Sequence, residues 1–85
     1  MKPERKKAED IIKKFIAIIQ NANKDWSESK TIEELKKSEG RYWFRAKETS
    51  QESVKMVLSS ILHEDNVMAY EINFWKKVQQ ELNAL

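Results

Sequence analysis

The residues best suited to acid–base or metal chemistry stand together at His63, Glu64 and Asp65. Consecutive residues of a helix point to different sides, so these three side chains would not converge on one ion or one substrate. Their spacing also differs from the His-Glu-x-x-His pattern of zinc enzymes. We interpret the trio as a solvated helix end and predict no metal site in it.

Nucleophilic catalysis has equally little support in the sequence. The chain has no Cys and a single His, which excludes thiolate chemistry and disulfides and leaves Ser59 and Ser60 with few candidate bases. Gly40 is the only glycine, so no Gly-rich phosphate loop exists. We therefore predict that the protein is not an enzyme and that it uses no cofactor.

Segment 41–47, with the sequence RYWFRAK, is the most suggestive stretch for binding. Aromatic rings can stack on bases while Arg and Lys neutralise phosphates, which is typical of nucleic-acid surfaces. The interpretation that we favour is that the aromatic residues anchor the core and the basic groups are solvated at its edge. The residues that would contact a nucleic acid are Arg41, Trp43, Arg45 and Lys47, together with the basic first helix.

Composition defines the class of protein. With 85 residues there is room for one domain, spanning 1–85. A hydrophobic fraction of 40%, a charged fraction of 35%, one Gly and one Pro indicate an all-α fold, a small bundle of three to four helices. The net charge of +2 is low for a protein that coats nucleic acid.

No stretch reaches the ~18 apolar residues that a membrane span needs. Lys13 and Lys14 also divide the apolar run near the N-terminus, which leaves it too short for the core of a signal peptide. We expect a cytoplasmic protein.

The elements that must position these residues are helices with recognisable ends. The first helix is predicted to begin at Pro3 and to end within 21–23, and 24–30 is predicted to be a connection. Thr31 and Glu34 match a capping box that would start a second helix, which Gly40 would end in a left-handed conformation. Segment 41–47 is predicted to be helix or ordered loop. Thr49 and Glu52 match a second capping box.

From there to the C-terminus, apolar residues recur every seven positions. These residues form the heptad seam: Val54, Ile61, Met68, Trp75 and Leu82. The seam is compatible with one helix over 50–85 or with two helices separated at 63–66, where the apolar phase shifts and Asp65 or Asn66 could cap the second helix. The break is slightly favoured.

Segment 67–85 has more large apolar side chains than one short neighbouring helix can cover, which is typical of contact with another chain. The predicted partner interface consists of Val67, Tyr70, Phe74, Trp75, Val78 and Leu82. We expect a protein-interaction module in a regulatory, inhibitory or adaptor role, acting as a homodimer. The alternative function is nucleic-acid binding through 41–47 and the first helix.

Overall fold

A computed structural model of the chain describes residues 2–63 and 68–85, and every regular element in these ranges is an α-helix. The five helices are α1 (Pro3–Ile19), α2 (Lys24–Glu28), α3 (Ile32–Ser38), α4 (Gly40–Leu62) and α5 (Ala69–Ala84). The prediction of an all-α fold is confirmed. None of the described helices is both long and apolar enough to cross a bilayer.

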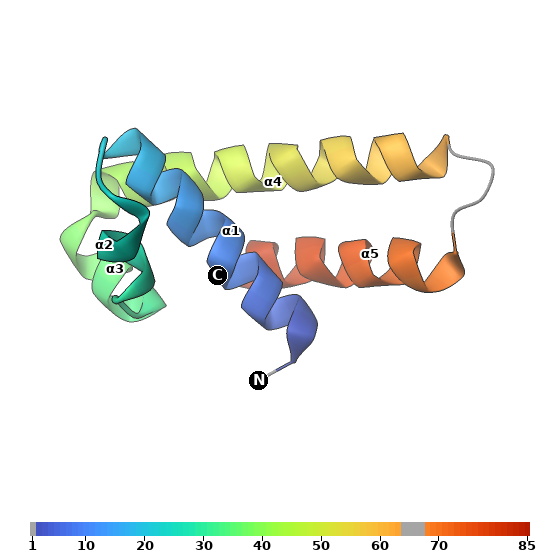
Figure 1. Cartoon of the computed structure of the whole chain (residues 1–85), viewed down its shortest axis with the longest axis horizontal. Coiled ribbons are helices and arrows are strands. Elements are labelled where there is room, and N and C mark those ends of the chain that lie inside the picture. The colour runs from blue at the N-terminus through green and yellow to red at the C-terminus, as the bar shows by residue number, and fades with distance from the viewer. Residues whose placement is uncertain (1, 64–67) are drawn as a thin grey trace.

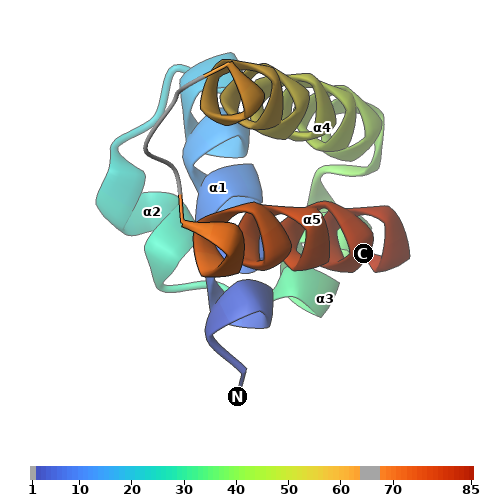
Figure 2. The ribbon, with the colours of Figure 1, turned by 90° about the vertical axis from the view of Figure 1, so that its right-hand side faces the viewer.

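The helices α4 and α5 form an antiparallel hairpin, and α1 crosses one of its faces (Figure 1). Seen along the hairpin, α1 lies beside both helices and α2 packs against α1 (Figure 2). The short α3 contacts α4. Because α1 crosses at an angle, the last turns of α4 and the first turns of α5 extend beyond it along the longest dimension, 42 Å.

The first helix begins at Pro3 and ends in a left-handed turn. Asn21 has a φ of 53°, and the amide of Ala22 donates to the carbonyl of Ala17 at 2.9 Å. This geometry is typical of a helix end at which the last carbonyls are satisfied by the next amides. The helix itself ends at Ile19, two residues before the predicted range of 21–23, and the left-handed turn falls at the start of that range, at Asn21.

The predicted connection over 24–30 contains the short helix α2. Its start is capped by Asn23, whose side chain accepts a hydrogen bond from the amide of Asp25 at 3.2 Å. Trp26 is half-buried against the core and Ser27 is buried. The segment is helical because its polar sequence includes a cap and an aromatic anchor.

The helix start predicted at the first capping box, at Thr31, is confirmed, and the one predicted at the second, at Thr49, is wrong. The hydroxyl of Thr31 accepts a hydrogen bond from the amide of Glu34 at 3.2 Å, at the start of α3. Thr49 instead lies inside α4, where its hydroxyl donates to the carbonyl of Arg45 at 2.8 Å. The helix had already begun at Gly40, so Thr49 has no free helix start to cap.

This difference predicts unequal effects of two similar substitutions. Thr31→Ala removes a cap and is expected to lower the free energy of unfolding by about 1 kcal/mol. Thr49→Ala, at an exposed helix interior, is expected to change it by less than about 0.5 kcal/mol. Urea unfolding followed by circular dichroism measures both. Equal losses for the two variants would contradict the assignment of the helix starts.

The prediction that Gly40 ends α3 in a left-handed conformation is wrong. No glycine has a positive φ, and Gly40 is the first residue of α4. Glu39, with φ −122° and ψ 33°, serves as the cap of both α3 and α4. Segment 41–47 is consequently the beginning of a long helix, one of the two forms predicted for it.

The C-terminal half consists of two helices, which is one of the two arrangements compatible with the heptad seam. α4 ends at Leu62 with His63 as its cap, and α5 begins at Ala69 with Met68 before it. The predicted caps Asp65 and Asn66 lie outside the described residues. The two halves of the heptad seam therefore belong to antiparallel helices that pack against each other.

The core lies where α1 crosses the hairpin. Ser50 is a buried polar residue in this region. Its hydroxyl has a hydrogen-bond partner, because it donates to the carbonyl of Ala46 at 2.7 Å. The buried apolar residues of this core are Ala8, Ile12, Ile16, Ile32, Leu35, Trp43, Ala46, Val54, Leu58, Val78, Leu82 and Leu85.

Candidate interaction surface

The free end of the hairpin has no buried side chain among the described residues. On α4 the last buried residue is Leu58, and on α5 the first is Val78. The residues between these two positions, 59–63 and 68–77, are here called the open end. Most of the open end extends beyond α1 (Figure 1), whereas Phe74 and Trp75 still pack against the edge of the core.

The open end carries large apolar side chains without a covering helix. Leu62, Met68 and Tyr70 are 60%, 62% and 67% exposed. Four further apolar residues are only partly buried: Ile61, Ile72, Phe74 and Trp75. Exposed apolar side chains grouped in this way are typical of surfaces that contact another macromolecule.

The heptad seam connects this surface to the core. Val54 and Leu82, at the two ends of the seam, are buried. Ile61 and Trp75 are half-buried and Met68, at the middle, is exposed. Burial decreases along the seam because two helices alone cannot enclose the side chains between them beyond the point where α1 crosses the hairpin.

The six residues predicted as a partner interface fall into three environments. Tyr70 is exposed, whereas Phe74 and Trp75 are half-buried and their rings meet edge to face, with centroids 5.6 Å apart. Val78 and Leu82 are fully buried, so within one chain they belong to the core and are not available as surface. Val67 lies outside the described residues.

Sequence reasoning missed Leu62, Met68, Ile61 and Ile72 as surface residues. The available signal was the heptad seam itself, which includes two of them. Met56 is 72% exposed but does not belong to this surface. It stands two positions from both Val54 and Leu58, on the opposite side of α4.

The basic and aromatic residues of 41–47 are divided between core and surface. Trp43 is buried, with the Nζ of Lys36 5.5 Å from its ring centroid. The Nζ of Lys47 donates to the carbonyl of Asn83 at 3.2 Å, near the negative end of the α5 dipole. Arg41 and Arg45 are exposed, so they remain available to a ligand.

Phe44 was not among the predicted contacts, yet it is 73% exposed. It stands three positions after Arg41, a spacing that makes the two side chains neighbours on a helix surface. The helical phase was the missing signal, because it decides that Trp43 points inward and Phe44 outward.

The basic start of α1 is partly neutralised by α5. Arg5 donates to Glu81 at 3.1 Å and to Glu9 at 3.1 Å, and the Nζ of Lys2 lies 3.7 Å from Glu81. The hydrogen bond to Glu81 is the main cause of the raised pKa of Arg5. A cationic surface at this end is therefore weaker than the sequence suggests.

The two basic segments also lie far apart. The side-chain amide of Gln20, just after α1, donates to Glu39, just before α4. The start of α4 is thus held at the end of α1, while Arg5 lies at its beginning. The 17 residues of α1 correspond to roughly 25 Å at about 1.5 Å per residue. Arg5 and Arg41 therefore do not form one compact patch.

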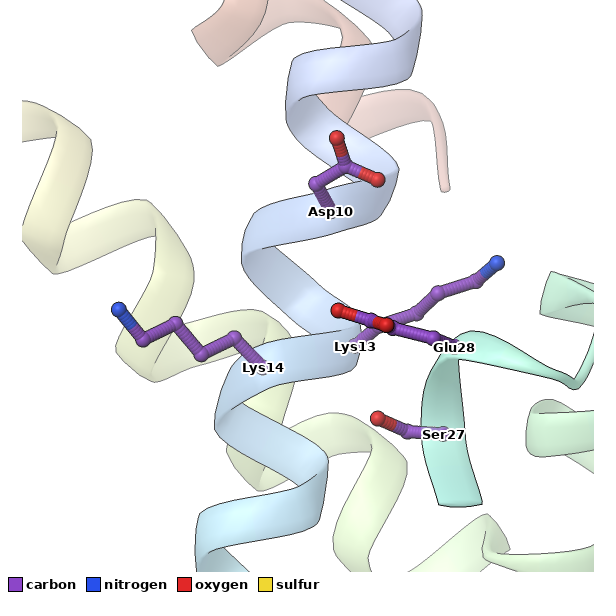
Figure 3. Close-up of a pocket in the computed structure, with 5 residues that line it drawn as sticks. All are labelled: Asp10, Lys13, Lys14, Ser27 and Glu28. Atoms are coloured by element: carbon purple, nitrogen blue, oxygen red, sulfur yellow. The ribbon is translucent and has the colours of Figure 1, made fainter. Parts of the chain in front are cut away.

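A polar hollow of about 440 Å³ lies between α1 and α2, lined by Asp10, Lys13, Lys14, Ser27 and Glu28. Figure 3 shows the ammonium groups of Lys13 and Lys14 pointing away from each other. Two acidic and two basic side chains line the hollow, so it has no excess charge to select an anion or a cation. We assign it no ligand.

The titratable trio is only partly described. His63 is exposed at the end of α4, in keeping with the predicted solvated helix end, whereas Glu64 and Asp65 lie outside the described residues. Among the described residues, no group of three or more His, Asp or Glu side chains could hold a metal ion.

Together these features describe a helical hairpin crossed by a third helix, with an apolar open end as its most unusual surface. Comparisons of the chain with protein-family models, with curated proteins and with solved structures find no match.

Proposed function

We propose that the protein is a small helical interaction module that works by binding through its open end, and that a second copy of the chain covers this surface. One observation carries the proposal: Leu62, Met68 and Tyr70 are exposed on a hairpin that lacks a third helix at that point. Two such hairpins packed together would make a four-helix bundle, a common solution for this architecture.

The apolar side chains available to such a dimer are few: three exposed and four half-buried in each chain. We therefore expect a weak association, with a dissociation constant of the order of micromolar.

Sedimentation velocity between about 1 and 200 µM tests the proposal, over a range chosen to bracket a micromolar constant. The expected result is a mass that rises from 10.1 kDa toward twice that value as concentration increases. A monomer throughout the range would overturn the proposal of self-association.

In this role the dimer would act by occupying or bridging another macromolecule, as a regulator, inhibitor or adaptor rather than as an enzyme. A cytoplasmic location stays a prediction from the sequence.

A second candidate function is binding of single-stranded nucleic acid at the beginning of α4. It is favoured by the exposed ring of Phe44 beside the exposed Arg41 and Arg45. An exposed aromatic ring can stack on a base while the guanidinium groups contact phosphates.

The test of this second function is fluorescence anisotropy with a labelled oligonucleotide at low and high salt. Arg41→Ala combined with Arg45→Ala is expected to weaken binding at least ~10-fold and to reduce its salt dependence. Phe44→Ala is expected to weaken it by roughly 5-fold or more through lost stacking. Lys55→Ala, remote from this site along α4, is the control. The absence of binding at low salt would rule this function out.

A further inference from the structure

The face of the hairpin that α1 crosses has a groove beside the open end. Ile11 and Phe15 of α1, Val57 of α4 and Trp75 of α5 line this groove of about 230 Å³. Its floor is apolar. It lies at the boundary between the half of the face that α1 covers and the half that α1 leaves open.

The edge of this groove is basic. Lys7 and Lys14, both exposed on α1, contribute to its lining. The Nζ of Lys7 lies 5.8 Å from the ring centroid of Trp75. Neither lysine makes an ion pair within the described part of the chain. A partner that fills the groove would therefore be favoured if it brought a carboxylate to this edge.

The open end carries such a carboxylate on the corresponding face. Glu71 stands four positions before Trp75 and seven before Val78, so it continues the apolar face of α5 that packs in the core. It is half-buried and has no ion-pair partner among the described residues. A charge in an apolar stripe costs free energy unless a partner group pairs with it.

We propose that two chains pack face to face about a two-fold axis, so that exposed apolar side chains of each open end, such as Leu62 and Tyr70, fill the groove of the other. In this arrangement Glu71 pairs with the basic edge formed by the partner's Lys7 and the partner's Lys14. Under such a rotation the half of the face that α1 covers in one chain meets the half that it leaves open in the other, as a self-complementary interface requires. This inference rests on the proposed homodimer and specifies its geometry.

A charge exchange tests the pairing, with sedimentation velocity as the readout. Glu71→Lys is expected to raise the dissociation constant of the dimer at least ~10-fold, because each change occurs twice in a symmetric interface. Lys7→Glu combined with Lys14→Glu is expected to have a similar effect. The triple variant, which exchanges the charges, is expected to restore the constant to within about 3-fold of the wild type.

Matched controls place the same charge changes elsewhere on the surface. Lys6→Glu with Lys13→Glu alters α1 outside the groove, and Glu48→Lys alters an exposed site on α4. Both are expected to leave the constant unchanged within about 3-fold. Circular dichroism confirms folding of each variant. If Glu71→Lys does not fold, Glu71→Gln is measured in its place and the triple variant is left out. The effect of Lys7→Glu combined with Lys14→Glu on the dissociation constant then decides whether the pairing is correct.

The outcomes distinguish the proposed homodimer from the face-to-face pairing of its chains. A wild-type chain that stays monomeric overturns the proposed function and this inference with it. A wild-type dimer that tolerates the charge reversals, or one that the triple variant fails to restore, overturns the face-to-face pairing and leaves the proposed homodimer standing.

Discussion

Leu62→Lys combined with Tyr70→Lys is expected to convert the dimer into a folded monomer. Both residues are exposed in the single chain, so their replacement should change its free energy of unfolding by no more than about 1 kcal/mol. In the dimer the same changes remove four apolar contacts and add four like charges. We expect the dissociation constant to rise at least ~100-fold, which sedimentation velocity measures.

The matched control places lysines at apolar residues of equal exposure outside the open end. Ile18 is 61% exposed near the end of α1, and Met56 lies on the opposite side of α4 from the core. Ile18→Lys with Met56→Lys is expected to leave the dimer intact. Dissociation by the control as strong as by the open-end variant would show that the association is non-specific.

Leu82→Ala is expected to destabilise the fold rather than the dimer. Leu82 is fully buried within one chain, and removal of a buried Leu side chain costs about 2–5 kcal/mol through lost contacts and the cavity left behind. In a domain with typical stability of roughly 5–15 kcal/mol this loss is a large share. Urea unfolding in the monomeric Leu62→Lys, Tyr70→Lys background measures it without a contribution from association.

The comparison for this second prediction is Ile18→Ala in the same background, which removes the same number of carbon atoms from a site that is 61% exposed. It is expected to change the stability of the monomer by less than about 0.5 kcal/mol. If Leu82→Ala altered only the oligomeric state, the original sequence-based assignment of Leu82 to a partner interface would be the better one.

Local signals in the sequence were sufficient to predict the helices and several of their ends. The capping box at Thr31 and the position of Pro3 gave two helix starts correctly. The phase shift at 63–66 indicated the break, because an apolar stripe that changes side cannot follow one straight helix. At Thr49 the local capping pattern did not start a helix, because this residue lies inside the longer helix α4, which packs in the core.

The extent of the open end could not be predicted in the same way. The heptad pattern assigns Val54, Met68 and Leu82 to one seam, but it does not say which part of the seam a third helix covers. That depends on the crossing angle of α1, which is set by contacts between residues distant in sequence. The predicted interface therefore combined core residues such as Val78 with surface residues such as Tyr70.

Among the predicted nucleic-acid contacts, too, the sequence pattern did not separate core residues from surface residues. Arg41, Trp43, Arg45 and Lys47 were selected from composition and proximity in the sequence. Once the segment is known to be helical, the spacing from Trp43 to the next buried residues determines that its ring enters the core. The exposed Phe44 follows from the same geometry, and only the helical phase could have distinguished the two rings.

The most direct test of a covered open end is the methyl NMR signal of Met68 followed on dilution, with Met56 as an internal reference. Both methionines are exposed in the single chain, but only Met68 lies in the open end. The account predicts that the Met68 methyl resonance shifts between high and low micromolar concentration while that of Met56 stays constant. A Met68 resonance that does not change, or one that changes only together with Met56, would contradict it.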